Sequence, residues 1–190
     1  MGKITKIVVI FLMVSIFAII ASAPVLLLNN SSITVLSDAE KINNSELQQQ
    51  VVTKLNNERV KDGDNRLVLR DEITEVARYK SERMKNEEYI SHTAPDGETV
   101  RDRFVKFDVR CQNVGENLAK TYYDRKVNTE YGGQKRYTSM DELSNGIVKQ
   151  FMNSQSHKEN LLRDDWESHG LSISITEDNA VYVAHKFCQK

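Results

Sequence analysis

The chain has 190 residues, and its 26 Lys and Arg residues nearly cancel its 27 Asp and Glu residues, which leaves a formal net charge of −1 at pH 7. Nucleic-acid binding needs a basic face, so this balance argues against a nucleic-acid partner and against a polybasic membrane-surface binder. The length accommodates one ordinary domain after an N-terminal segment is set aside.

The N-terminal segment has the composition of an export signal. Lys3 and Lys6 precede an apolar run over residues 7–28, and a charged start followed by an apolar core directs export. Small residues at 21–23 suit a cleavage site, whereas the run also approaches the ~20 residues that span a bilayer. Residues 1–28 are therefore predicted to be a signal peptide or a membrane anchor, and the remainder is predicted to be extracellular or at the cell surface.

The next residues separate this segment from the folded domain. Residues 29–44 are polar and aperiodic and are predicted to form a linker, with the domain spanning 45–190. Ser45 and Gln48 form a capping-box pattern for a first helix that ends at Gly63. Its inward face is predicted from apolar residues at helical spacing: Leu47, Val51, Val52 and Leu55.

Two further helices follow a short extended stretch over residues 66–69. Asp71 is predicted to cap the second helix, which turns four apolar residues inward: Ile73, Val76, Ala77 and Met84. Pro95, Asp96 and Gly97 form a turn signal. Thr99 then caps a short third helix that contains Phe104.

The second half of the domain is predicted to hold a loop, a helix and a hairpin. Residues 121–139 are polar and are read as a long surface loop, whose tyrosines form either a contact surface or a polar insertion without a role. Ser139 and Glu142 give a capping box for a helix with an apolar stripe: Leu143, Ile147, Val148 and Phe151. Residues 171–175 alternate as a half-buried strand, and a turn at 177–179 leads into a strand over 181–187. This order predicts helices packed on an antiparallel sheet.

Both cysteines lie beyond the export segment. An exported chain meets oxidising conditions, so a Cys111–Cys188 disulfide is the expected use, closing a loop of 77 residues. Two free buried thiols are the alternative.

The histidines and one glutamate are candidates for chemistry. His92 precedes the turn at Pro95, and His157 follows the amphipathic helix. Glu116 precedes an apolar pair and is expected to point inward, where a carboxylate needs a partner. His169 is expected to be exposed at a strand start, and His185 is expected to pack within the last strand or point to solvent.

Three segments in this order resemble the CAP superfamily, which includes cysteine-rich secretory proteins, venom antigens and plant pathogenesis-related proteins and contains the SCP domain. They are Ser91 to Gly97 (SHTAPDG), Gly115 to Ala119 (GENLA) and Phe151 to Leu162 (FMNSQSHKENLL). The resemblance covers about residues 45–190 and is greatest to the bacterial and archaeal branch.

The resemblance implies a three-layer α-β-α sandwich with a central antiparallel sheet and a cleft. In the family two His and two acidic residues line the cleft and hold a divalent metal such as zinc. Carried over by position, His92, Glu116 and His157 fill three of the four places. The fourth falls near Ser154, which is not a carboxylate, and Phe151 stands where the family has Trp.

Two imidazoles and one carboxylate are an acceptable zinc ligand set that leaves a position for water. The same three residues could instead form a hydrogen-bonded cluster that ties segments of the domain together. We expect a non-catalytic module that binds an extracellular ligand or surface partner through this cleft. The alternatives are a disulfide-stapled domain with a structural or interaction role only, and a metal-dependent hydrolase or peptidase that uses His92, Glu116 and His157.

Overall fold

The computed structural model of the chain describes residues 42–128 and 134–190. The predicted export segment at 1–28 and most of the predicted linker at 29–44 lie outside these residues. Within the described ranges, no helix combines the length and the apolar character that a membrane crossing requires.

Helix α1 spans Asn44–Asp62 and begins two residues earlier than the sequence pattern predicted. Its cap is Asn43, whose side chain accepts hydrogen bonds from the main-chain N–H groups of Ser45 and Glu46, so Ser45 is not the capping residue. Gly63 ends the helix in a left-handed conformation with φ of 100°, which glycine adopts without steric cost. The four apolar residues predicted to face inward are all buried: Leu47, Val51, Val52 and Leu55.

The chain then forms β1 (Val68–Leu69), α2 (Asp71–Asn86) and α3 (Val100–Lys106). Arg70 rather than Asp71 is the cap of α2 and offers no side-chain hydrogen bond. The predicted inward face of α2 is confirmed by the burial of Ile73, Val76, Ala77 and Met84. Thr99 caps α3 in a full capping box with Asp102, and Phe104 is buried.

Strand β2 (Asn113–Tyr122) was not predicted, and it corrects the interpretation of residues 121–139 as a surface loop. The first two of those residues belong to β2, and a small hairpin of β3 (Val127–Asn128) and β4 (Gln134–Lys135) follows. Tyr123 and Tyr137 are core residues, with 3% and 9% of their surface exposed, so they do not form a contact surface. Tyr131 lies outside the described residues.

Helix α4 (Met140–Asn153) is followed directly by α5 (Gln155–Leu161). The Ser139 hydroxyl accepts from the Glu142 N–H at 3.2 Å, as predicted. The Glu142 carboxylate, however, accepts from the Thr138 N–H at 2.9 Å, one residue before the expected position. The apolar stripe of α4 is buried at all its predicted positions: Leu143, Ile147, Val148 and Phe151.

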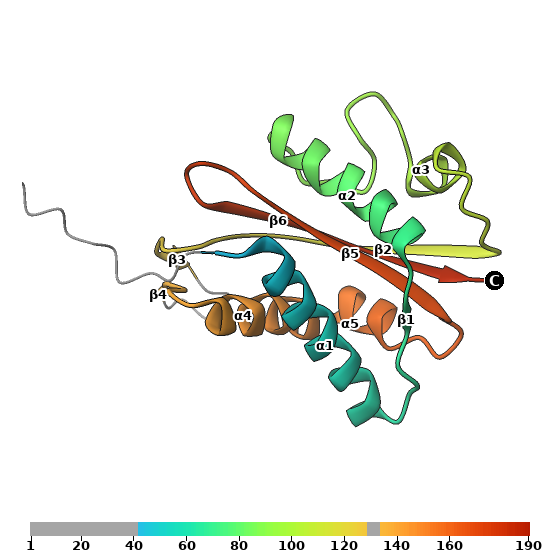
Figure 1. Cartoon of the computed structure of the whole chain (residues 1–190), viewed down its shortest axis with the longest axis horizontal. Coiled ribbons are helices and arrows are strands. Elements are labelled where there is room, and N and C mark those ends of the chain that lie inside the picture. The colour runs from blue at the N-terminus through green and yellow to red at the C-terminus, as the bar shows by residue number, and fades with distance from the viewer. Residues whose placement is uncertain (1–41, 129–133) are drawn as a thin grey trace, which may run out of the picture. The chain divides into compact units, whose positions relative to one another are not determined.

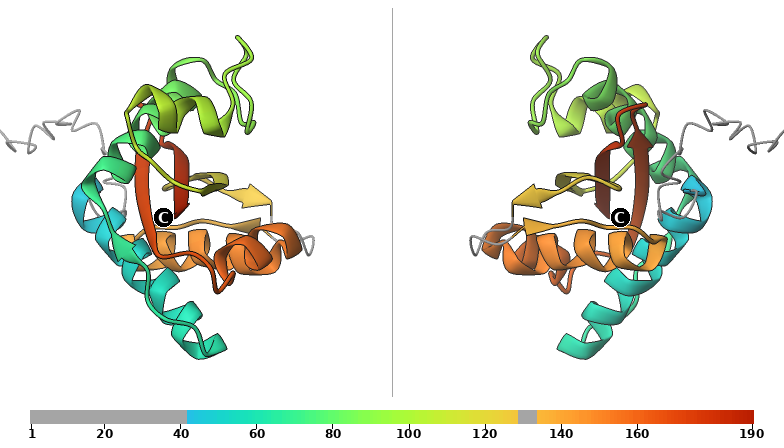
Figure 2. Two further views of the ribbon diagram at one scale, coloured as in Figure 1. Left: turned by 90° about the vertical axis from the view of Figure 1, so that its right-hand side faces the viewer. Right: turned by 90° about the vertical axis from the view of Figure 1, so that its left-hand side faces the viewer.

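The sheet has the strand order β1-β5-β6-β2, with β5 (Ser168–Ile175) and β6 (Ala180–Gln189) at its centre. The β5–β6 and β6–β2 pairs are antiparallel, and β1 is parallel to β5. Helices α2 and α3 cover one face, and α1, α4 and α5 cover the other (Figures 1 and 2). The predicted α-β-α sandwich is confirmed.

Strand β5 is buried on both faces and not half-buried as its alternation predicted. The serines at its polar positions lie under α2, where the Ser81 hydroxyl hydrogen-bonds to Ser172 at 3.1 Å and to Ser174 at 2.9 Å. Helix α2 approaches closely at Gly170, because a Cβ atom there would lie 2.2 Å from the main-chain nitrogen of Thr74. A second helical layer therefore covers a face that the pattern assigned to solvent.

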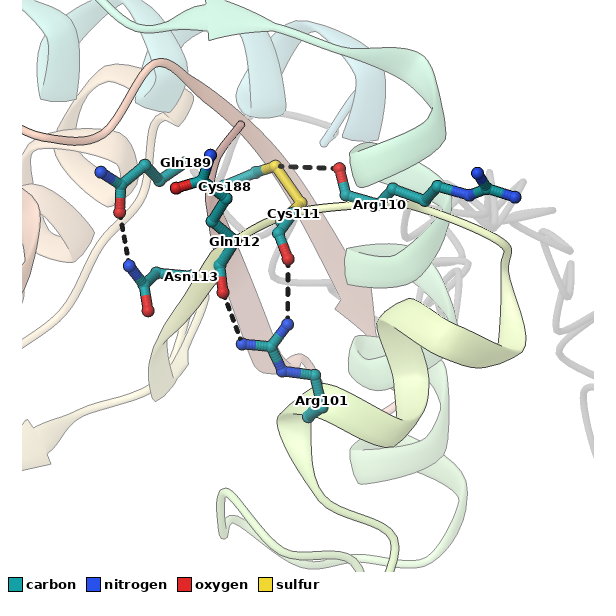
Figure 3. The surroundings of a disulfide bond; sticks show 7 residues. All are labelled: Arg101, Arg110, Cys111, Gln112, Asn113, Cys188 and Gln189. Atoms are coloured by element: carbon teal, nitrogen blue, oxygen red, sulfur yellow. Dashed lines mark hydrogen bonds between the residues drawn. A yellow bond between two sulfur atoms is a disulfide. The ribbon is translucent and has the colours of Figure 1, made fainter.

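The predicted disulfide between Cys111 and Cys188 is present, with a Cα–Cα distance of 5.5 Å. It joins the chain before β2 to the end of β6 (Figure 3). The Arg101 side chain on α3 donates hydrogen bonds to the carbonyl oxygens of Cys111 at 3.0 Å and Gln112 at 2.9 Å. The disulfide and Arg101 together fix the entry to β2, the strand that carries Glu116.

Candidate functional site

Glu116 lies on β2 with only 1% of its side chain exposed, and three groups surround its carboxylate. The Arg103 guanidinium donates to Oε2 at 3.1 Å. The Lys186 ammonium donates to the same oxygen, and His92 Nδ1 lies 2.8 Å from Oε1. The predicted inward orientation of Glu116 is confirmed, and its partners come from α3, from β6 and from the segment before the turn at Pro95.

These partners keep Glu116 ionised. Burial alone would raise its pKa, but the hydrogen bond from His92 and the charges of Lys186 and Arg103 outweigh burial and lower the pKa to about 2. A carboxylate with that pKa is an anion at every physiological pH. It therefore accepts hydrogen bonds and has no proton to donate.

The charge of Glu116 fixes the tautomer of His92. Because the carboxylate only accepts, Nδ1 of His92 must carry the proton of their 2.8 Å hydrogen bond. In the neutral ring the lone pair then belongs to Nε2. The His92 side chain is 57% exposed, so a buried anion orients an imidazole that is accessible to a ligand.

Two buried cations hold the segment that carries His92. Lys80 on α2 donates to the Ser91 carbonyl oxygen at 2.6 Å and to the Tyr89 hydroxyl at 3.1 Å. Arg103 donates to the His92 carbonyl oxygen at 2.8 Å. Burial lowers the pKa of Lys80 to about 8 and that of Lys186 to about 8. The sequence did not predict Lys80, Arg103 or Lys186 as part of the site. The position of Lys186 within the largely apolar strand β6 is a signal that could have found it, because a buried lysine needs a partner.

His157 follows α4 on α5 and completes the set of predicted residues. Its ring is edge-on to Phe151 at 5.5 Å, and its Nδ1 atom is buried with no hydrogen-bond partner in the described part of the chain. Burial lowers the pKa of His157, and the positive charge of a protonated His92 lowers it further. The two imidazoles are therefore within electrostatic reach of each other.

An amide network ties α5 to β2 beside this ring. The Asn117 amide donates to the His157 carbonyl oxygen at 2.8 Å, and the Asn160 amide donates to Asn117 at 2.9 Å. The Trp166 indole donates to the Asn160 carbonyl oxygen at 2.7 Å. Trp166 also lies against Gly115, where a Cβ atom would come within 2.7 Å of its ring. The motif residues on either side of Glu116 thus fix the position of His157.

Glu116 does not fit the role of a metal ligand. Arg103 and Lys186 already bind its Oε2 atom and His92 its Oε1 atom, so coordination would require displacing buried cations. In the described part of the chain, no three His, Cys, Asp or Glu side chains form a group that could hold a metal ion. A role for His92 and His157 in binding zinc stays a prediction.

His169 and His185 form a second histidine cluster, separate from this site. Nδ1 of His169 lies 2.9 Å from Nε2 of His185, and both rings are buried, with 1% and 0% exposed. The expectation that His169 is exposed is wrong, because its ring lies against His185, whose ring lies 6.4 Å from that of Phe151 on α4. The His185 ring contacts Phe187 at 4.1 Å, which agrees with packing in the core.

Comparison with known proteins gives the same family as the motifs. Residues 52–187 match the model of the cysteine-rich secretory protein family, or CAP. The chain therefore belongs to this family.

Similar proteins include the uncharacterized protein YkwD of Bacillus subtilis (strain 168), which is 28% identical over 139 residues, or 73% of this chain and 46% of YkwD. The uncharacterized membrane protein YlbC of the same organism is 28% identical over 126 residues, or 66% of this chain and 31% of YlbC. The chain thus spans less than half the length of these two relatives.

Two solved structures have the same fold. An outer surface protein from Borrelia burgdorferi aligns with a TM-score of 0.64 and 24% identity, over 80% of this chain and 98% of that one. An extracellular protein containing an SCP domain from Bacillus anthracis str. Ames aligns with a TM-score of 0.59 and 21% identity, over 80% of this chain and 45% of that one.

Proposed function

We propose that the chain is an exported or cell-surface CAP module that binds a ligand through His92 and His157 without catalysing a reaction. The observation that carries this proposal is the state of Glu116: a buried anion held by Arg103 and Lys186 that orients an exposed imidazole. Such an arrangement presents a fixed hydrogen-bonding group at the surface.

The chemistry of the carboxylate favours binding over catalysis. A general acid or base works best with a pKa near the operating pH, whereas the pKa of Glu116 is about 2. Its oxygens are also occupied by cations, so it is not placed to activate a water molecule. His92 and His157 remain the groups that a ligand would meet.

The export signal predicted at residues 1–28 supports extracellular placement. The Cys111–Cys188 disulfide also suits an oxidising compartment. Two proteins with the same fold are described as an outer surface protein and an extracellular protein. Cleavage after the apolar run at residues 7–28 would release the domain from the cell, whereas retention of the run would attach the domain to the membrane.

The test is a binding screen of the full chain against arrays of peptides, lipids and glycans, beside the His92→Ala/His157→Ala double variant. We expect at least one ligand class to bind the wild-type chain and to be lost in a folded double variant. Equal binding by both proteins would favour a structural role for the histidines. Hydrolysis that requires both histidines would favour the metal-dependent hydrolase or peptidase.

A further inference from the structure

Strand β2 has ten residues and lies at the edge of the sheet, because among the described strands it pairs with β6 alone. In an antiparallel pair, successive residues alternate: one directs its main-chain N–H and C=O groups to the partner strand, and the next directs them away from it. The Tyr123 N–H donates to the Asn179 carbonyl oxygen at 2.9 Å. Residues that lie an even number of positions before Tyr123, such as Asn117 and Ala119, therefore direct their main-chain groups to β6.

The main-chain groups of Glu116, Leu118 and Lys120 consequently point away from the sheet. The Lys120 carbonyl oxygen agrees with this outward direction, since it accepts a hydrogen bond from the Gln150 side chain on α4 at 3.4 Å and not from β6. For Glu116 and Leu118, no hydrogen bond to the outward main-chain groups is found among the residues of the described ranges. A row of unpaired N–H and C=O groups is a template for another strand.

The exposed surface of Glu116 is main-chain surface. Only 1% of its side chain is exposed, whereas the whole residue is 7% exposed. Leu118 is 5% exposed as a whole residue. Solvent therefore reaches Glu116 through its main-chain atoms.

Segments on both sides flank this edge. On one side Tyr89 packs against the apolar cluster that contains Leu118, and His92 bonds to Glu116. On the other side, the Gln150 side chain contacts the strand at Lys120 and the His157 carbonyl oxygen accepts from Asn117. The first of these walls presents the exposed imidazole of His92.

We propose that the ligand of the site is an extended peptide segment, which adds to the outer edge of β2 between His92 and His157. This inference rests on the proposed function and names its ligand class. Main-chain hydrogen bonds to Glu116 and Leu118 would supply the affinity, and the two flanking walls would select side chains.

The test uses the full chain, uniformly labelled with ¹⁵N, and a capped decapeptide in which Val alternates with Thr and Lys. At a peptide concentration ten times the dissociation constant, hydrogen exchange at the Glu116 and Leu118 amides should slow about tenfold. Exchange at Asn117 and Ala119, which already bond to β6, serves as the internal control. The same peptide N-methylated at consecutive central residues should have no effect, because it cannot donate to the strand.

Three results would overturn the inference. The first is unchanged exchange at the Glu116 and Leu118 amides with millimolar peptide. The second is an equal effect from the N-methylated peptide. The third is slow exchange at both amides without peptide that disappears on dilution, which would indicate pairing between copies. None of these touches the proposed function, which fails only if the array screen shows no ligand that depends on His92 and His157.

Discussion

His92 Nδ1 lies 2.8 Å from Oε1 of Glu116, although 57% of the histidine side chain is exposed and only 1% of the glutamate side chain is. The hydrogen bond connects the protein surface to a buried cluster of charges. Arg103 and Lys186 neutralise the carboxylate from the inside, and the carboxylate orients the imidazole on the outside. The orientation of His92 therefore depends on the buried Glu116 carboxylate, which a ligand does not reach.

Replacement of Glu116 should lower the free energy of unfolding. In Glu116→Gln, the positive charges of Arg103 and Lys186 would remain buried without compensation, which costs about 3 to 5 kcal/mol for a broken buried pair. Urea denaturation followed by circular dichroism measures the loss. Glu72→Gln on the exposed side of α2 is the control and should change stability by less than about 0.5 kcal/mol. Similar values for the two variants would refute the role assigned to Glu116.

The buried pair of His169 and His185 predicts a loss of stability in mild acid. Burial is the main cause that lowers the pKa of His169 to about 4 and that of His185 well below 6.5. The unfolded chain takes up these protons near pH 6.5, whereas the folded protein takes up the His169 proton only near pH 4 and the His185 proton only well below pH 6.5. The free energy of unfolding should therefore fall as the pH falls from 6.5 to 4, by up to about 1.4 kcal/mol per pH unit for each imidazole.

Urea denaturation at several pH values tests this slope. In His169→Gln/His185→Gln the dependence of the free energy of unfolding on pH between 6.5 and 4.5 should become flatter than in the wild-type protein. Glu116 contributes only at lower pH, because its unfolded and folded pKa values are 4.5 and about 2. A slope that persists in the double variant would show that other groups cause it.

The disulfide should be a large part of the stability of the domain. It closes a loop between residues 77 positions apart, which on the chain-entropy model contributes about 4 kcal/mol. Cys111→Ser/Cys188→Ser should unfold at correspondingly lower urea concentration, and a reductant should destabilise only the wild-type protein. No change on reduction would mean that Arg101 and β2–β6 pairing already fix the entry to β2.

Close packing of α2 on β5 makes Gly170 sensitive to substitution. A Cβ atom at this position would meet main-chain atoms of Ile73 and Thr74 at 2.2 to 2.6 Å, so Gly170→Ala should cost about 1 to 3 kcal/mol through overpacking. Gly146→Ala is the comparison, because the three atoms nearest to its Cβ would belong to the Tyr137 side chain and not to the main chain. A greater loss in Gly146→Ala than in Gly170→Ala would contradict this account.

Local patterns predicted the helices well because caps and apolar spacing act over a few residues. The inward faces of α1, α2 and α4 follow directly from that spacing. The start of α1 was misplaced because Asn43 and Ser45 are both good caps, and only the tertiary position of the chain selects between them. Strand β2 was missed because its polar residues are satisfied by distant partners and not by solvent.

The candidate site was predicted in part, for the same reason. The motifs identified His92, Glu116 and His157, but Arg103 and Lys186 lie 13 residues before and 70 residues after Glu116. No sequence spacing links these charges, since the fold brings them together across α3, β2 and β6. The burial of His169 likewise depends on the layer of α1, α4 and α5, which the sequence of β5 alone does not predict.

The central claim, binding without catalysis at His92 and His157, is tested most directly by following captured peptides over time. The full chain would be incubated with each peptide that it binds on the array, with and without zinc, and the peptides would be analysed by mass spectrometry. We predict that the peptides remain intact in both conditions and that binding is lost in His92→Ala/His157→Ala. Cleavage products that form with the wild-type chain and vanish with the double variant would contradict the account and establish a hydrolase.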